Sequence, residues 1–507
     1  MNSLSSWTRL ANVSKVDYIC AGLATLTAYV VYCAIWRLYI SPIAHFPGPR
    51  LAALTDLYEA YYNNWLGGKY IWKIDELHKQ YGPIVRISPR DLHVGDPDFY
   101  DVLYPSTTDR RRADKAPSLT KFFGLDNSLF STVSHDIHRM RRAALLPYFS
   151  PSHVRRLQPA FQELLDVLLK RLSDLKDTNE PVNANCVFAA FSNDMTHILA
   201  FGESQHKLET PDFDSSERDA SLSGAQSFHV LKRAPWLNNV MMALPVWFSQ
   251  CLNPALGSFM RQKKMTREKV AQLASTSDDD WEGRNTPVFR GLLHSPKLPA
   301  EEKTVERVAE DAQMLLMAGT LTMASTLEHL IYWMVDNPDV LRKLKEELRT
   351  AMPSVNDVGK TPLGHARGPP VPDGCHQGSR SADLRQLNAA FPHRPGRTPG
   401  LQGRGDGKEL GDSVRDTGGH DERAASSQRG PFSQHRICLG MPQGYGVLRL
   451  VLSQIWRLWA SPGAMIGDEI GVLSLYNTTA EDVKMVGDFF VAAYKKPQGV
   501  EFKLHSM

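Results

Sequence analysis

The sequence lacks both a strong excess of charge and any cluster of cysteines. Its 507 residues include 58 Lys and Arg and 55 Asp and Glu, which gives a net charge of +3. This balance is too even to indicate nucleic acid as a partner. The six cysteines are scattered, with no CxxC pair and no spacing typical of zinc ligands, so neither a disulfide framework nor a zinc site is predicted.

Residues 360–430 lack the large apolar side chains from which a core is built. This segment contains no Ile, Met, Tyr or Trp and a single Phe, Phe391, whereas Gly, Arg, Pro, Asp and Ser dominate it. Such a composition cannot bury enough apolar surface to offset the entropy lost on ordering. Taken by itself, the segment is predicted to be disordered.

Charge is missing from an apolar run near the N-terminus, Tyr18 to Trp36. As a helix, its 19 residues would span about 28 Å, close to the thickness of a bilayer core. A cleaved signal peptide is the alternative, but its apolar stretch would be shorter and would end at small residues. We predict a tail over residues 1–17, a transmembrane anchor over 18–36 and a proline-rich hinge over 37–50.

The remaining residues, 51–507, read as mainly α-helical with a few short strands. Residues 71–81 are helix-like, and residues 84–89 and 91–96 alternate apolar and polar side chains. This order predicts a helix, a two-stranded hairpin and then a helix over 96–104. By itself the order fits many folds that combine helices and strands.

Two further apolar stretches follow. Residues 186–202 predict a buried helix that ends at Gly202. Residues 227–248 are apolar and aromatic, which fits ordinary core or a surface that dips into a membrane. The sequence alone leaves both interpretations open.

Residues 305–338 predict a helix of more than thirty residues, far above the average length. Gly319 lies in its middle, where Gly costs about 1 kcal/mol relative to Ala. A flat ligand or O₂ that approaches the backbone would explain this glycine. The alternative is a long buried helix with an incidental Gly.

His138 and Arg142 are four residues apart in a stretch, residues 135–157, that predicts a helix with a break near Pro147. Residues at this spacing share one face of a helix, so both side chains could reach the edge of one ligand. The alternative is a solvated basic face.

Near the C-terminus, Arg436-Ile437-Cys438-Leu439-Gly440 is typical of a turn that presents a thiolate to a haem iron. Gly440 lets the backbone pass close to the sulfur because it has no Cβ. Arg436 could pair with a carboxylate. The alternative for Cys438 is an ordinary buried cysteine.

The last stretch resembles the haem-binding loop of the cytochrome P450 superfamily, Phe-x-x-Gly-x-Arg-x-Cys-x-Gly. Arg436, Cys438 and Gly440 match this pattern, whereas Pro431 replaces the Phe and Gln434 replaces the first Gly. The resemblance implies that Cys438 binds the iron of haem b. A thiolate ligand pushes electron density onto the iron and favours O–O cleavage.

The two helical stretches resemble the same superfamily. Its Trp-x-x-x-Arg motif, on a helix that contacts the haem propionates, corresponds to His138 and Arg142, and many fungal members have His at the first position. Its central motif, Ala/Gly-Gly-x-Asp/Glu-Thr-Thr, corresponds to residues 318–323. The Thr that helps to deliver protons maps to Thr322, and the acid maps to Leu321, so this chain lacks the carboxylate.

The resemblance covers residues 15–355 and 436–507 and is to microsomal fungal members of the trichodiene-oxygenase type. It implies a cytochrome P450 fold, mainly α with small β-sheets, behind one transmembrane helix in the endoplasmic reticulum, with the catalytic domain in the cytoplasm. It also implies electrons from an NADPH–cytochrome reductase partner and insertion of one oxygen atom of O₂ into an apolar small molecule, a terpenoid or other secondary metabolite. Residues 227–248 then fall where substrate-access helices lie.

Residues 355–435 do not fit the superfamily. A Glu-x-x-Arg helix and a Pro/Arg loop are expected here and neither is found, because Glu346 and Arg349 precede the expected place. The abrupt loss and recovery of pattern suggests a shifted reading frame or a misassigned exon. The alternative is a real insert in a non-catalytic, membrane-anchored remnant that does not hold haem.

Overall fold

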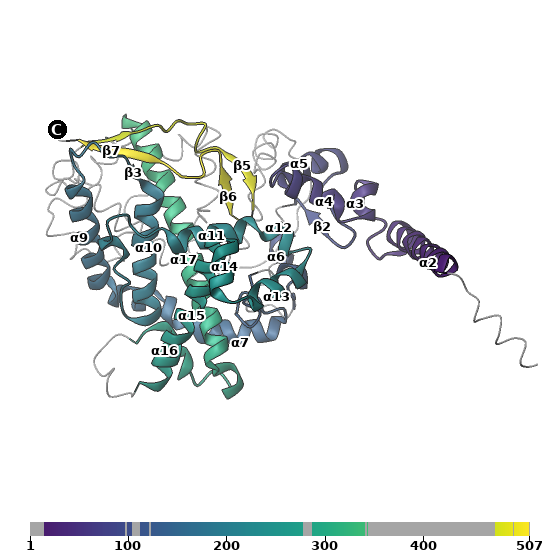
Figure 1. The fold of residues 1–507 in the computed structure, drawn as a ribbon, viewed down its shortest axis with the longest axis horizontal. Coiled ribbons are helices and arrows are strands. Elements are labelled where there is room, and N and C mark those ends of the chain that lie inside the picture. Colours follow the sequence, from purple (N-terminus) through teal and green to yellow (C-terminus); the bar gives the residue numbers. More distant parts are fainter. Residues whose placement is uncertain are drawn as a thin grey trace, which may run out of the picture. The chain divides into compact units, whose positions relative to one another are not determined.

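The computed structural model describes residues 15–96, 99–103, 112–120, 123–276, 286–339, 342, 472–489 and 491–505. The chain divides into two compact units, Met1–Ser106 and Thr107–Met507. Among the described residues, helices predominate and the strands form three small sheets, which confirms the predicted fold class (Figure 1). The segment 355–435, the motif 436–440, Glu346 and Arg349 all lie outside the described residues.

The first unit begins with an exposed apolar helix. Helix α2 (Lys15–Ile35) runs directly into η1 (Trp36–Ile40), one turn of π-helix. Its apolar side chains face outward, and Tyr18 is 66% exposed. The stretch Val16–Ile40 is long and apolar enough to cross a membrane. The helix therefore extends four residues beyond the predicted end of the anchor, into the predicted hinge.

Short elements make up the rest of the first unit. They are α3 (Arg50–Leu54), α4 (Leu57–Ala60), η2 (Tyr61–Trp65), α5 (Tyr70–Tyr81), β1 (Ile84–Arg86), β2 (Leu92–Val94) and α6 (Tyr100–Leu103). Helix α5 ends at Gly82, whose φ of +96° suits a residue without Cβ. Strands β1 and β2 pair antiparallel, with Val85 opposite His93, as the alternation predicted. Of the helix predicted over 96–104, the structure describes only the four residues of α6.

The second unit is built around two long helices that pack side by side, α10 (Ala184–Phe201) and α17 (Val305–Asp336) (Figure 1). Asn183 caps α10 by accepting a hydrogen bond from the Cys186 N–H (3.0 Å), and Gly202 ends it in the left-handed conformation, as predicted. Thr304 caps α17 in the same way. The long helix expected over 305–338 is therefore confirmed.

The other helices of the second unit surround this pair. They are η4 (Pro117–Leu119), α7 (His135–Leu145), η5 (Leu146–Phe149), α8 (Pro151–Arg156), α9 (Gln158–Asp174), η6 (Lys207–Glu209), α11 (Ser216–Gln226), α12 (Phe228–Leu231), α13 (Pro235–Ala243), α14 (Val246–Leu252), α15 (Pro254–Ser275), α16 (Val288–Leu293) and η8 (Ala300–Lys303). The break predicted near Pro147 is confirmed, because a 3₁₀ turn separates α7 from α8. In the stretch 227–248, Trp236 and Trp247 are 67% and 69% exposed. The ordinary-core interpretation is therefore wrong for these two residues.

Strands that follow residue 471 complete the second unit. They are β4 (Val472–Leu475), β5 (Met485–Asp488), β6 (Ala492–Tyr494) and β7 (Glu501–His505), and the earlier strand β3 (Val182–Asn183) joins them. The order β3-β7-β4 is antiparallel throughout, and β5 pairs with β6 around a bulge. Phe502 and Leu504 of β7 are 1% exposed and belong to the same core as α10 and α17. The C-terminal segment thus folds onto the helices that precede residue 337.

Candidate functional site

The middle of α17 contacts α10 at Gly319. A Cβ on this glycine would lie 2.6 Å from Thr196 Oγ1 and 3.0 Å from its Cγ2. Thr196 cannot easily move, because its hydroxyl donates to the Ser192 carbonyl at 2.6 Å. Gly319 therefore has a steric reason in a close helix–helix contact, and the expectation that a flat ligand or O₂ approaches its backbone stays a prediction.

The side of α17 that carries Ala318, called the open face below, is exposed in the part of the chain that the structure describes. Ala318 is exposed although it lies in the middle of a helix whose other faces supply the core, and Thr322, one turn later, is half-buried on the same face. The Thr322 hydroxyl donates to the Ala318 carbonyl at 2.8 Å, and Thr326 donates to the Thr322 carbonyl at 2.8 Å. Such bonds satisfy a hydroxyl within its own helix and bend the helix slightly. The open face therefore presents a methyl group, a hydroxyl that can also accept a hydrogen bond, and the half-buried side chain of Leu321.

On α7, His138 and Arg142 are both half-buried. The Arg142 Nε is buried and has no hydrogen-bond partner among the described residues, and burial lowers the pKa of this guanidinium. Burial also lowers the pKa of His138 to about 4, with further lowering by the cations Lys115 and Arg142. His138 is therefore neutral at pH 7. A buried guanidinium nitrogen without an acceptor, within a group of cations, is suited to hold an anion.

This arrangement fits haem, because a propionate carboxylate would supply the acceptor that Arg142 Nε lacks among the described residues. The predicted iron ligand Cys438, with Arg436 and Gly440, lies outside the described residues. Within the described part of the chain, no group of three or more His, Cys, Asp or Glu side chains is arranged to hold a metal ion. Of the predicted site residues, the structure thus places Gly319 and Thr322 on α17 and His138 and Arg142 on α7.

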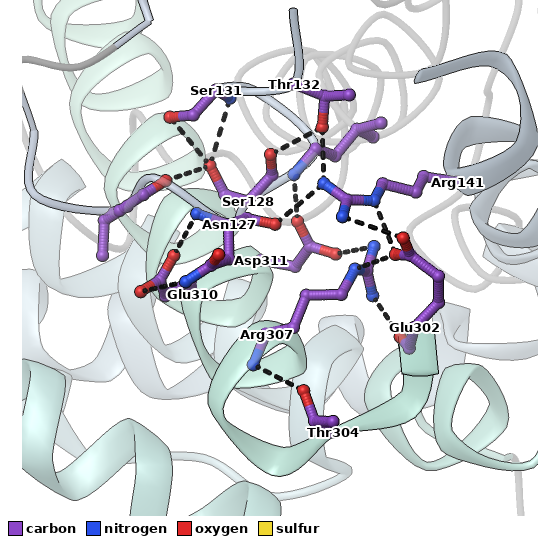
Figure 2. A network of polar contacts seen from close by, with 12 residues as sticks. Asn127, Ser128, Ser131, Thr132, Arg141, Glu302, Thr304, Arg307, Glu310 and Asp311 are labelled. Atoms are coloured by element: carbon purple, nitrogen blue, oxygen red, sulfur yellow. Dashed lines mark hydrogen bonds and ion pairs between the residues drawn. The ribbon is translucent and has the colours of Figure 1, made fainter. Parts of the chain in front are cut away.

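A buried network of four charged side chains joins these two helices (Figure 2). Arg141 on α7 donates to both Glu302 carboxylate oxygens, from Nε at 2.6 Å and from Nη2 at 3.0 Å. Arg307 Nε lies 2.7 Å from the same carboxylate, and Arg307 Nη2 donates to Asp311 at 2.9 Å. The second Asp311 oxygen accepts the Leu129 N–H at 2.5 Å. The network therefore links α7, η8, the first turns of α17 and the loop before α7.

The electrostatics of the network balance. The four side chains are between 3% and 16% exposed, and two positive charges face two negative charges. Burial raises the pKa of Asp311 against the opposing charge of Arg307. Burial acts to raise the pKa of Glu302 as well, but hydrogen bonds and charge from Arg141 and Arg307 outweigh it and lower the pKa. A carboxylate held from two sides by guanidinium groups is a rigid anchor point.

Sequence analysis did not single out these residues. Arg307 and Asp311 carry a local signal, because opposite charges four residues apart share a helix face. Arg141 and Glu302 are 161 residues apart, and nothing local to either indicates that they meet.

Comparisons with known proteins agree with these features. The sequence model of the family described as Cytochrome P450 matches residues 58–363. Cytochrome P450 monooxygenase tpcC of Cochliobolus heterostrophus is 34% identical over 498 residues, covering 91% of this chain and 92% of that protein. Tryptophan 6-hydroxylase fscE of Fusarium equiseti is 32% identical, covering 93% of this chain and 94% of that protein. Cytochrome P450 monooxygenase TRI4 of Trichoderma arundinaceum is 29% identical and covers 73% of this chain and 71% of that protein.

Proposed function

The chain belongs to the cytochrome P450 family of monooxygenases, as found in fungal secondary-metabolite pathways, and from this premise we propose that it inserts one oxygen atom of O₂ into an apolar small molecule, a terpenoid or other secondary metabolite. The observation that carries the proposal is the open face of α17 at Ala318 and Thr322. A long core helix that leaves its middle exposed, with one hydroxyl on that face, is suited to line a reaction chamber.

The cofactor would carry the difficult chemistry: haem bound through the Cys438 thiolate supplies activation of O₂. The residues of this chain bind the haem, orient the reactants and supply protons. Arg142 pairs with a propionate through the guanidinium whose Nε lacks a partner. His138 is neutral before haem binds. When haem binds, His138 gains a proton or donates a hydrogen bond from its N–H to the same propionate edge. Arg436 and Gly440 are proposed to complete the thiolate loop.

Proton delivery is assigned to the Thr322 hydroxyl. Its hydrogen bond to the Ala318 carbonyl leaves the oxygen lone pairs free to accept from a water molecule. Leu321 occupies the position of the family's acid, so no carboxylate on this turn competes for that water. For a proton to pass, the Thr322 hydroxyl would release the Ala318 carbonyl, donate its own hydrogen toward the haem side and accept another from this water molecule. Ala318 and Leu321 contribute apolar surface that excludes bulk water.

We also propose the cellular setting. Helix α2 anchors the protein in the endoplasmic reticulum membrane, with the catalytic unit in the cytoplasm. There an NADPH–cytochrome reductase supplies the electrons. The apolar stretch 18–36 and the similarity to cytochrome P450 monooxygenases support this arrangement.

The test is the absorption spectrum of the reduced protein with CO, because a thiolate-ligated haem gives a characteristic shift. Full-length protein purified in detergent is expected to show the shift, and Cys438→Ser is expected to abolish it. Cys251→Ser is the matched control and should keep the shift, because Cys251 lies on α14 and is exposed. Wild-type protein without the shift would support the remnant interpretation instead.

A further inference from the structure

Arg141 and Arg142 are consecutive on α7 and serve different purposes. Consecutive residues of an α-helix point about 100° apart. Arg141 points into the buried network, where its guanidinium also donates to Thr132 Oγ1 at 2.6 Å and to the Asn127 carbonyl at 2.9 Å (Figure 2). These contacts fix the rotation of α7 about its own axis. The direction of Arg142, and of His138 one turn earlier, is thereby set.

Glu302 is the residue on which this rotation depends. Its carboxylate is the only acidic group among the described residues that accepts hydrogen bonds from Arg141, and Arg307 holds it from a second side. Arg307 is held in turn by Asp311, and Asp311 by the backbone of the loop that precedes α7. The anchor is therefore fixed to α17, the helix that carries Thr322.

The buried setting makes this anchor hard to replace. Removing one partner of a buried ion pair leaves an uncompensated charge that must find another partner or water. Without the Glu302 charge, Arg141 and Arg307 would face each other across a mostly buried site. Helix α7 would relieve this repulsion by rotating or shifting, and the orientation of Arg142 would be lost.

We infer that Glu302 is a positioning residue for haem: through Arg141 it holds α7 in the rotation that directs His138 and Arg142 to the propionates. The inference rests on the proposed function, specifically on the role given to Arg142. Glu302 itself does not touch the cofactor. It joins the helix that holds the propionates to the helix that carries the proton-delivering threonine.

The test compares Glu302→Gln with wild type in full-length, haem-loaded protein. Haem loss is measured by transfer to excess apomyoglobin, and hydrogen exchange of the α7 amides is measured in the haem-free protein. Glu302→Gln is expected to lose haem roughly 10–100-fold faster, as is typical when the partner that orients a ligand residue is removed. The α7 amides should exchange faster as well.

Two controls separate positioning from general stability. Glu306→Gln, in the first turn of α17, removes an exposed ion pair with Arg267 of α15 and should change neither measurement. Thr266→Val removes a buried hydrogen bond to Gln313 on α17 that does not involve α7. It should lower the melting temperature while haem loss stays at the wild-type rate.

A conservative variant keeps the test decisive if Glu302→Gln does not fold. Arg141→Lys retains the positive charge but loses the paired hydrogen bonds, so its haem loss should lie between wild type and Arg141→Gln. A wild-type rate of haem loss in Glu302→Gln, or in Arg141→Gln, would overturn the positioning role. That result is distinct from failure of the proposed function, which would appear as wild-type protein without the CO-induced shift.

Discussion

Thr322 is the residue whose chemistry depends most on its immediate neighbour. Superfamily members carry an acid before this threonine, whereas this chain has Leu321, and the other hydroxyl of the turn, on Thr320, is buried against Asn193. The structure places that hydroxyl on the open face of α17, bonded to the Ala318 carbonyl. In the proposed mechanism, proton supply depends on this side chain and on the water that it binds.

We expect Thr322→Val to uncouple electron transfer from product formation, since Val keeps the volume and removes the hydroxyl. Losing one proton-transfer group should lower product formation roughly 10²–10⁴-fold, while NADPH oxidation continues and peroxide accumulates. The measurement is product and peroxide per NADPH, with any apolar compound that perturbs the haem spectrum. Haem content should be unchanged.

Thr326→Val is the matched control, because Thr326 makes the same type of backbone hydrogen bond one turn further on and should leave coupling intact. Leu321→Glu should improve coupling by restoring the carboxylate. Unchanged coupling in Thr322→Val would mean that ordered water alone carries the protons.

Among the elements, α2 has exposed apolar side chains on all sides, and such a helix is stable only when another apolar surface covers it. We expect a membrane to provide that surface. Deleting residues 1–36 should release much of the protein from membranes, as judged by its appearance in the supernatant after alkaline extraction. Deleting residues 1–14 leaves α2 whole and should leave the protein in the membrane fraction. Full-length protein that is soluble without detergent would contradict the assignment.

Two helices with similar sequence signals, α2 and α17, have different surroundings. Both α2 and α17 are long and apolar enough to span a membrane. Helix α17 is instead 44% buried over its apolar window, because α10 and α15 pack against it, and charged residues in its first turns enter the polar network. Helix α2 has no such neighbours among the described residues.

For the whole molecule, stability should depend on pH through buried histidines. Burial lowers the pKa of His93 and His138 to about 4 and that of His197 to about 3, against 6.5 for a free side chain. Below pH 6.5 these histidines become protonated in the unfolded chain but stay neutral in the folded chain. The contribution of these histidines to stability is therefore fully present above pH 6.5 and is lost as the pH falls toward 4.

His197→Leu tests this dependence, because both ring nitrogens of His197 are buried without a partner among the described residues. Each such histidine contributes a slope of about 1.4 kcal/mol per pH unit to the free energy of unfolding within its window. The variant should show a shallower loss of stability between pH 6.5 and 4.5, measured by denaturant unfolding of the haem-free protein. His294→Gln, at an exposed position, should keep the wild-type slope. An unchanged slope in His197→Leu would show that His197 is solvated or paired.

The sequence by itself determined the elements that depend on local signals. The period of apolar residues placed α17, the glycine after Phe201 ended α10, alternation placed β1 and β2, and the uncharged run placed α2. These follow from side-chain spacing, capping and backbone freedom within a few residues. The resemblance in short motifs then indicated the family correctly.

Only the tertiary structure decided the contacts between distant segments. It assigned Gly319 to a contact with Thr196, paired Arg141 with Glu302, and brought β7 between β3 and β4. None of these follows from spacing, because Gly319 and Thr196, Arg141 and Glu302, and strands β3 and β7 are each more than a hundred positions apart. Packing of the core decides which groups become buried. A buried charge needs an opposite charge, and a buried strand edge needs hydrogen-bond partners, wherever in the sequence these lie.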